Sequence, residues 1–399
     1  FGSVLIGESK IMTLTISANE VGGTNGGVST KVECWDQDFL ISDHLGETET
    51  GEQEILLEEG EHVTVYLKFE PTSVGVKSAT LTIGSDCKNV SLLGTGAVEG
   101  GWTIDRMPGG TDLYDVWGNG YETFACGASA TVLSKVGSEG TWTALEETGI
   151  ADIPLLTVWG FEGDAVWFGG GMCDFGMTYA KAYRYYPTLE TWTELPASLI
   201  DCFGSAWGTS ACNIYFGGAS ISGMMPNAVQ WDCSEFDGFI IGMEYDLVSG
   251  IFGSGPGDIW AVQANHYDSL CHYNGTRWEG TKESFMDKAL FDVWVASGGE
   301  ACAVGAGGAI YYYNGVSWQD HTLESTADTI FGVWGLSADD IYAVGTNANI
   351  WHWDGNIWMS QAVPAEATGT LYSVWMGGSG VGYAVGKNGL ILIFRANGS

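Results

Sequence analysis

A short motif that recurs seven times constrains the fold of this chain more than any other feature. It is a hydrophobic residue, two further residues, and then Val-Trp-Gly or a close variant. A repeat of about 40–45 residues is typical of the four-stranded blade of a β-propeller. The motif therefore predicts seven blades. Its aromatic residues, Trp117, Trp159, Trp207, Phe252, Trp294, Trp334 and Trp375, are separated by 42, 48, 45, 42, 40 and 41 residues.

Further strand signals follow each copy of the motif. A short apolar run ending in glycine comes first, as in 342–345, and is typical of a buried strand. An Asn-Gly or Asp-Gly pair such as Asn274-Gly275 then predicts a hairpin, and a tryptophan such as Trp278 opens the last strand. The glycine-rich run 305–308 aligns with these turns, and no helix follows to present its N-terminus to a phosphate, so we predict an ordinary turn there.

The end of the repeat indicates how the ring closes. The seventh copy runs out at Arg395 before any fourth strand, and a matching tryptophan, Trp102, stands 15 residues before Trp117. The equivalent gaps, from 142 to 159 and from 358 to 375, are 17 residues. We therefore predict that a strand at 102–106 completes the seventh blade, which removes exposed sheet edges. Residues 99–399 are predicted to form the propeller.

The repeats resemble the Trp-rich propeller repeats common in large bacterial secreted proteins. Blades two and three also resemble kelch repeats, through Gly169-Gly170 with Trp192 and Gly217-Gly218 with Trp231. The resemblance covers about residues 101–396. It implies a fold but not an activity, because propellers serve as enzymes, lectins and scaffolds alike.

Residues 1–98 carry a different pattern, in which apolar and polar residues alternate over runs such as 63–67 and 79–83. The segments 1–4, 69–71 and 93–96 resemble the immunoglobulin-like domain family found in Hydin and in bacterial anchor-type proteins. That resemblance implies a β-sandwich of about 100 residues. The expected fold class is all-β, an N-terminal immunoglobulin-like β-sandwich followed by a seven-bladed β-propeller.

The charge balance limits the partners. The chain has 14 Lys and Arg against 49 Asp and Glu, a formal net charge of −35. Nucleic acids and anionic membranes attract cationic proteins, so neither is an expected partner. No run of 18 apolar residues is present, so we expect no direct insertion into a membrane.

Nine cysteines lack the close paired spacing of a zinc site and favour disulfides formed in an oxidising compartment. Propeller topology places Cys173 and Cys202 on one face of adjacent blades, and Cys212 and Cys233 on the opposite face of blade three. We predict the pairs 173–202 and 212–233, and a pair 34–87 within the sandwich. Cys126 replaces a buried valine of the repeat and is predicted to be a free core thiol. The expected location is extracellular or at the surface of a bacterial cell.

No catalytic set emerges from the remaining residues. His272 and His352 share one repeat position, which favours a structural role. The acidic loop with Asp232, Glu235 and Asp237 is a candidate calcium site, and no other cofactor is expected.

The candidate binding residues lie in loops between second and third strands, at about 170–182, 218–229 and 263–269. Ordinary propeller turns are polar, but these are apolar and rich in methionine, which adapts to irregular partners. They predict a surface for a protein or glycan partner; packing of the loops as a lid over the channel is the alternative. The residues are Met172, Phe175, Met177, Tyr179, Ile221, Met224, Met225, His266 and Tyr267.

The expected function is that of a secreted or cell-surface binding or adhesion scaffold, which could act within a larger surface assembly. The alternative is a secreted carbohydrate-active enzyme, a glycoside hydrolase or lyase, with its site over the central channel. Carboxylates or histidines converging on the channel would favour the enzyme. An exposed apolar or aromatic patch on one face would favour the binding protein.

Overall fold

The structure is a computed structural model of residues 1–399. Up to residue 97 it describes the strand backbones, with the side chains of residues 64 and 66–68. Beyond residue 97 it describes 100–105, 110–145, 152–161, 163–171, 180–196, 199–219, 226–242, 247–264, 270–281, 283, 285–323 and 328–396. No described helix is long and apolar enough to span a membrane.

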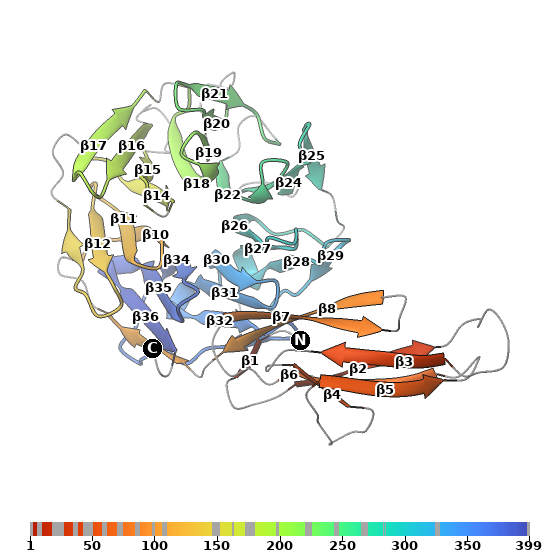
Figure 1. The fold of residues 1–399 in the computed structure, drawn as a ribbon. Helices are drawn as coiled ribbons and strands as arrows, with labels where there is room; N and C mark the ends of the chain where they lie inside the picture. Colours follow the sequence, from red (N-terminus) through yellow and green to blue (C-terminus); the bar gives the residue numbers. More distant parts are fainter. Residues whose placement is uncertain are drawn as a thin grey trace. The chain divides into compact units, whose positions relative to one another are not determined.

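The chain divides into two compact units, residues 1–100 with 396–399, and residues 101–395. The first unit contains a five-stranded sheet in the order β1-β8-β7-β3-β5 and a three-stranded sheet in the order β2-β6-β4 (Figure 1). β1 pairs with β8 in parallel, and the other described pairings of the unit are antiparallel. The strands are β1 (Ser3–Leu5), β2 (Lys10–Ser17), β3 (Val28–Cys34), β4 (Phe39–Ser42), β5 (Gly51–Leu57), β6 (His62–Phe69), β7 (Gly75–Ile83) and β8 (Lys88–Ala97).

The second unit is a seven-bladed β-propeller, as the repeat predicts, with seven four-stranded antiparallel sheets around a central axis (Figure 1). Blade 1 comprises β10 (Leu113–Gly118), β11 (Glu122–Gly127), β12 (Val132–Val136) and β13 (Thr143–Ala144). Blade 2 comprises β14 (Leu155–Gly160), β15 (Val166–Gly170), β16 (Lys181–Tyr186) and β17 (Thr191–Leu195). Blade 3 comprises β18 (Cys202–Ser210), β19 (Asn213–Ala219), β20 (Ala228–Trp231) and β21 (Phe236–Phe239).

The other four blades follow in chain order. Blade 4 comprises β22 (Val248–Gly255), β23 (Asp258–Gln263), β24 (Leu270–Tyr273) and β25 (Trp278–Thr281). Blade 5 comprises β26 (Leu290–Val295), β27 (Ala301–Gly305), β28 (Ile310–Tyr313) and β29 (Trp318–Asp320). Blade 6 comprises β30 (Ile330–Ser337), β31 (Asp340–Gly345), β32 (Ile350–Trp353) and β33 (Trp358–Ser360). Blade 7 comprises β34 (Leu371–Met376), β35 (Val381–Gly386), β36 (Ile391–Ala396) and β9 (Gly100–Ile104).

The ring closes as the tryptophan spacing predicts. β9, which carries Trp102, is the fourth strand of the blade that contains Trp375. The strand spans 100–104 where the sequence indicated 102–106, and the amide of Asp105 still donates to the carbonyl of Ile391. The buried ammonium of Lys135 in blade 1 pairs with the Asp105 carboxylate. This ion pair therefore fastens the closing strand to the first blade.

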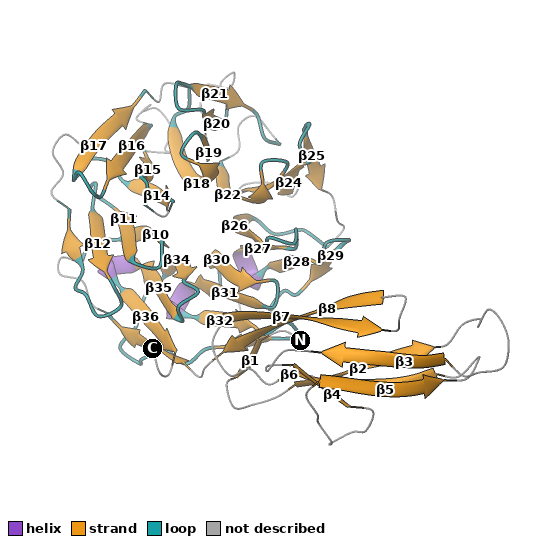
Figure 2. Ribbon diagram, in the orientation of Figure 1, coloured by secondary structure: helices purple, strands orange, loops and turns teal. Residues whose placement is uncertain are grey.

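The short connections between second and third strands in blades 5, 6 and 7 explain the glycine-rich run at 305–308. Each is a single turn of 3₁₀ helix: η1 (Ala306–Gly308), η2 (Thr346–Ala348) and η3 (Lys387–Gly389), drawn purple in Figure 2. The middle residue has a positive φ in all three, 61° at Gly307, 59° at Asn347 and 56° at Asn388. Glycine and asparagine adopt that conformation most readily, so the run is a turn and not a phosphate-binding loop.

The repeated tryptophan adopts two orientations that alternate around the ring. In blades 1, 3, 5 and 7 it is buried against the next blade, and a methyl group at Gly160 would lie only 2.7 Å from the Trp117 ring. Gly118, Gly253 and Gly335 are crowded in the same way by the tryptophan of the blade before them. In blades 2, 4 and 6 the aromatic residue turns toward the axis. At the position of these glycines, the blades that follow Phe252 and Trp334 carry Val295 and Met376, whereas the blade that follows Trp159 keeps Gly208.

Candidate binding channel

The site begins with a β-bulge at the same place in every first strand. Near the beginning of each first strand, its register against the second strand shifts, for example between Leu113 and Asp115 and between Leu290 and Asp292. A bulge inserts one unpaired residue and redirects its side chain. The bulge residues all line the central cavity, and they are Tyr114, Leu156, Gly204, Ser249, Phe291, Phe331 and Tyr372.

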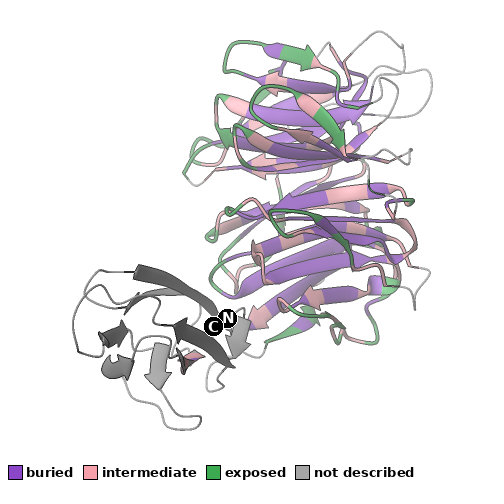
Figure 3. Ribbon diagram, turned by 90° about the vertical axis from the view of Figure 1, so that its right-hand side faces the viewer, coloured by how far each residue is buried: buried purple, intermediate pink, exposed green. Residues whose placement is uncertain are grey.

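The cavity has a volume of about 270 Å³ and lies on the axis of the ring, between the first strands of all seven blades. In Figure 3 the interior of the propeller is buried, and the exposed segments lie toward its outside and in turns. The described lining contains no Lys, Arg or His. Its two ionisable carboxyl groups are Asp115 and Asp292.

Three aromatic rings fill the axis on the side toward which the first strands run. Trp159, Phe252 and Trp334 come from blades 2, 4 and 6, and their ring centroids lie 5.6–6.2 Å apart. The Trp334 indole donates to the carbonyl of Met376 at 3.1 Å. Aromatic rings at these distances are in direct contact. The cavity therefore has an aromatic floor, and its mouth lies where the first strands begin.

Aromatic bulge residues cover one side of the mouth. Tyr114, Phe291, Phe331 and Tyr372 are half-buried. Phe291 and Phe331 have centroids 5.2 Å apart, Phe331 and Tyr372 are 5.6 Å apart, and Tyr372 and Tyr114 are 5.6 Å apart. We call these four residues, from blades 5, 6, 7 and 1, the aromatic arc. On the opposite side, blades 2, 3 and 4 carry the smaller Leu156, Gly204 and Ser249.

Asp115 is held by four donors. Its carboxylate accepts from the amide of Val116 at 2.9 Å and from the amide of Val158 in the next blade at 2.8 Å. The hydroxyls of Thr157 and Ser373 also donate to it, at 3.2 and 2.7 Å. Burial raises the pKa of Asp115 to about 6, and these donors oppose the rise. The residue links three consecutive blades, 7, 1 and 2.

Asp292 occupies the same repeat position in blade 5 with half as many donors. It accepts from the amides of Val293 and Val333, at 2.8 and 2.9 Å. The neighbouring blades carry glycine, Gly250 and Gly332, where Asp115 has Thr157 and Ser373. Burial raises the pKa of Asp292 to about 8, and the nearby charge of Asp115 adds to the rise. The two carboxyl groups therefore share one position but differ in how fully the protein satisfies them.

The loop residues predicted to bind a partner, Met172, Phe175, Met177, Tyr179, Ile221, Met224, Met225, His266 and Tyr267, lie outside the described residues. The strand ends that flank these segments are described. Gly170, Ala219 and Gln263 pair with Leu155, Cys202 and Val248, the first residues of their inner strands. These ends therefore lie at the mouth of the channel.

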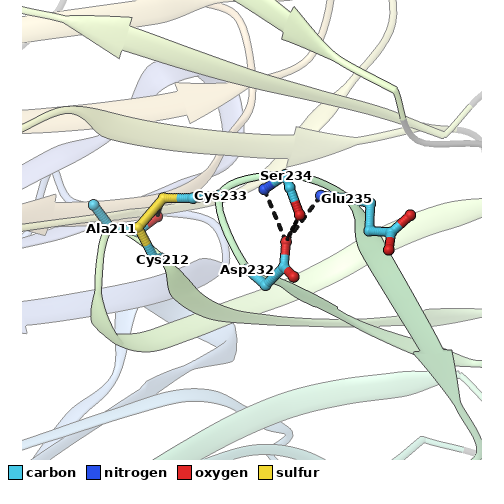
Figure 4. The surroundings of a disulfide bond; sticks show 6 residues. All are labelled: Ala211, Cys212, Asp232, Cys233, Ser234 and Glu235. Atoms are coloured by element: carbon cyan, nitrogen blue, oxygen red, sulfur yellow. Dashed lines mark hydrogen bonds between the residues drawn. A yellow bond between two sulfur atoms is a disulfide. The ribbon is translucent and has the colours of Figure 1, made fainter.

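Cys212 and Cys233 form a disulfide, the pair expected from the sequence (Figure 4). Cys202 is also disulfide-bonded; Cys173, its predicted partner, lies outside the described residues. The predicted pair 34–87 stays a prediction, since Cys87 and the Cys34 side chain are not described. Cys126 is a buried free thiol, as is Cys302.

The acidic loop beside this disulfide has a local explanation. Oδ1 of Asp232 accepts from the amide and hydroxyl of Ser234 and from the amide of Glu235, at 2.7–2.9 Å (Figure 4). These bonds lower the pKa of Asp232 to about 2. Within the described part of the chain no group of three or more His, Cys, Asp or Glu is arranged to hold a metal ion. Calcium binding at Asp232, Glu235 and Asp237 stays a prediction.

The two histidines that share a repeat position make the same contacts in blades 4 and 6. Nε2 of His272 lies 2.6 Å from Oδ1 of Asp258, and Nε2 of His352 lies 2.7 Å from Oδ1 of Asp340. Each imidazole stacks on the aromatic residue paired with it in the second strand, Trp260 or Tyr342. The repetition agrees with the structural role predicted from the sequence.

The residues that line the channel were not predicted from the sequence, although the enzyme alternative placed its site over the central channel. The bulge residue stands three positions before the repeated aromatic residue, so aligning the seven repeats exposes it as the most variable column of the motif. That column runs Tyr, Leu, Gly, Ser, Phe, Phe, Tyr from blade 1 to blade 7. Variation within an otherwise regular inner strand is the signal that was available.

No protein-family model matches the chain, and no curated protein matches it. Several solved structures share its fold. YCF48 bound to D1 peptide has a TM-score of 0.60 at 12% identity, covering 75% of this chain and 96% of that one. The WD40 β-propeller domain of Doa1 has a TM-score of 0.57 at 13% identity, covering 75% and 98%. Virginiamycin B lyase from Staphylococcus aureus, in a catalytically inactive form with quinupristin, has a TM-score of 0.61 at 11% identity, covering 74% and 99%. At these identities the similarity shows only that the chain shares the propeller fold with these proteins, of which one was solved with a bound peptide and one is a lyase.

Proposed function

We propose that this protein is a binding module that holds a polypeptide partner at the mouth of its propeller channel. One observation carries the proposal: the bulge residues of all seven first strands line one cavity, and four of them place half-buried aromatic rings along one side of its mouth. Half-buried aromatic residues around a concave opening are typical of recognition sites. A solved neighbour, YCF48, is described with a bound peptide.

The hydrogen bonds of the two carboxyl groups support binding over catalysis. Asp115 and Asp292 each accept from the backbone amide of the following blade, and in this way they hold adjacent inner strands together. A glycosidase needs one carboxyl group free to donate a proton to the leaving group and a second one free to act as general base or nucleophile. The enzyme alternative draws its support from Asp292, because a carboxyl group whose pKa is about 8 is largely protonated at neutral pH and could donate a proton.

We further propose that the module works outside the cell or on its surface, in adhesion to a protein or glycan. The disulfide between Cys212 and Cys233 and the disulfide-bonded Cys202 support an oxidising compartment. The first unit, with sheets of five and three strands, supports the immunoglobulin-like sandwich that the sequence resembles. A kelch-like origin for blades 2 and 3 rests on the sequence resemblance.

The test is selection of short linear peptides from a random library against the full chain, followed by affinity measurements on mouth variants. Replacing Phe291 and Phe331 with Ser should lower the affinity for the selected peptides at least about tenfold, since each buried aromatic contact contributes on the order of 1 kcal/mol or more to binding. The matched control is Tyr121→Ser. Tyr121 is 72% exposed in the turn between β10 and β11, at the opposite end of the strands.

A second variant tests the apolar loops, with Phe175, Met224 and Met225 all replaced by Ser. If the loops contribute to the surface, this variant loses binding and keeps its melting temperature. The proposal would be overturned if the selected peptides bound the Phe291/Phe331 variant, the loop variant and the Tyr121→Ser control with equal affinity. Turnover of an oligosaccharide library, abolished by Asp292→Asn, would establish the enzyme alternative.

A further inference from the structure

Asp292 has unused hydrogen-bonding capacity at the channel. A carboxylate offers about four acceptor sites, and the two backbone amides that reach Asp292 occupy two of them. No third donor is recorded for it among the described residues, whereas Asp115 has four. The difference comes from Gly250 and Gly332, which carry no hydroxyl group.

Those glycines are required by packing, so the unused capacity is built into the blade. A methyl group on Gly250 would lie 2.8 Å from Cα of Asp292, and one on Gly332 would lie 2.8 Å from the carbonyl oxygen of Tyr372. Both contacts are with backbone, which cannot move aside cheaply. A ligand group in the cavity can fill the vacant acceptor positions, and the protein's own side chains at these two positions cannot.

The aromatic arc begins at the residue next to Asp292. Phe291 is the bulge residue of the same strand, and the arc continues from it through Phe331 and Tyr372 to Tyr114. Burial raises the pKa of both Tyr114 and Tyr372, and the charge of Asp112 adds to the rise, so both phenols are neutral at physiological pH. Faces of neutral aromatic rings attract cations.

The surrounding charges favour the same ligand. The ionisable groups around Asp292 are Asp115 and the buried thiol of Cys302, whose pKa burial and Asp292 both raise. No cationic side chain is among the described lining, and the whole chain carries a formal charge of −35. A negative field of this kind accelerates association with cationic partners.

We propose that the channel receives one cationic side chain, Lys or Arg, from the polypeptide partner, with Asp292 as its anchoring carboxylate and the aromatic arc around its alkyl stem and charged head. The inference rests on the proposed function and adds the chemistry of the contact. The cavity of about 270 Å³ accommodates a single long side chain, while the partner's backbone stays at the mouth. Entry of the cation favours the ionised form of Asp292, so binding releases a proton near neutral pH.

The experiment uses the full chain and blocked hexapeptides that differ only at one central residue, Lys, Arg, norleucine or Glu, with affinity measured by calorimetry. The Lys and Arg peptides should bind at least about tenfold tighter than the norleucine peptide, a difference of about 1.4 kcal/mol. Asp292→Asn should abolish that preference. The matched control is Asp232→Asn, which removes one negative charge at an exposed turn and should leave the preference unchanged.

Two further arms keep the test decisive. Phe331→Leu retains an apolar side chain but removes a π face, and it should reduce the preference for Lys even if Asp292→Asn folds poorly. For the wild type, affinity for the Lys peptide should rise between pH 6 and pH 8, as Asp292 loses its proton.

The outcomes separate the two proposals. Equal binding of the Lys and norleucine peptides, still weakened by Phe291→Ser and Phe331→Ser, would overturn the cationic anchor and leave the binding module standing. Failure of every peptide to bind would overturn both. Butylammonium alone binding as tightly as the Lys peptide would assign the channel to a small organic cation and overturn the polypeptide source.

Discussion

Asp115 and Asp292 stand at the same position of the repeat, in blades 1 and 5, and differ in the side chains that the neighbouring blades offer to the carboxyl group. Asp115 accepts four hydrogen bonds and lies at the seam where blade 7 meets blade 1. Asp292 accepts two and lies between two glycines of the neighbouring blades. The first is a clamp that the protein satisfies by itself. Asp292 also joins blade 5 to blade 6, but it keeps acceptor positions that a ligand group can use.

This difference shows how a repeat protein separates structure from recognition. Both residues perform the same task toward the next blade, an aspartate oxygen accepting from the amide two residues beyond the bulge. Where the neighbouring blades carry Thr157 and Ser373, their hydroxyl groups donate two further hydrogen bonds to the carboxylate. Where they carry Gly250 and Gly332, no side chain can do so. A symmetric scaffold can therefore carry an asymmetric site without altering its backbone.

The largest expected effect is on stability. Asp115→Ala leaves two backbone amides and two hydroxyls without their acceptor, and it should lower the free energy of unfolding by about 3 kcal/mol. Asp292→Ala leaves two backbone amides without their acceptor and should lower the free energy of unfolding by about half as much. Urea unfolding followed by tryptophan fluorescence reports on the propeller, because every tryptophan except Trp35 lies beyond residue 100. A loss for Asp292→Ala as large as that for Asp115→Ala would erase the distinction.

The pH dependence of stability separates the two carboxyl groups next. A raised pKa means that the folded protein binds protons more tightly than the unfolded chain, so each group's contribution is fully present below about pH 4 and declines as pH rises. The decline ends near pH 6 for Asp115 and near pH 8 for Asp292. Between pH 6 and pH 8 the melting temperature of the wild type should fall more steeply than that of Asp292→Asn. Parallel curves over that interval would contradict the raised pKa of Asp292.

The smallest expected effect sharpens the comparison by making one site resemble the other. Ser373→Ala removes one of the four donors to Asp115 and should cost about 1 kcal/mol. It should also raise the pKa of Asp115 from about 6 toward the value of Asp292, adding slope between pH 6 and pH 8. The control is Ser249→Ala, whose hydroxyl bonds the carbonyls of Val262 and Leu290 and no carboxylate. An unchanged slope in Ser373→Ala would show that the hydroxyl does not control the titration.

Much of the architecture could be predicted because it is written as periodic spacing. The intervals between repeated aromatic residues set the number of blades, and the position of Trp102 relative to Trp117 located the closing strand. The disulfide between Cys212 and Cys233 followed from the order of strands within one blade. The residues of the channel site were not predicted, because the long loops carry the more conspicuous apolar residues and the bulge column of the inner strands stands out only when the seven repeats are aligned.

The sequence by itself determined which residues recur, and hence the fold of the second unit, because four-stranded blades impose a period that any reader of the chain can measure. Only the tertiary structure decided how equivalent residues differ. The alternation of the repeated aromatic residues between the blade interface and the axis depends on seven strands meeting around one channel. So does the convergence of Asp115, Asp292 and the aromatic arc, which come from blades far apart in the chain. The repeat predicts the strands of each blade. The contacts across the ring join residues far apart in the chain, so no local sequence pattern predicts them.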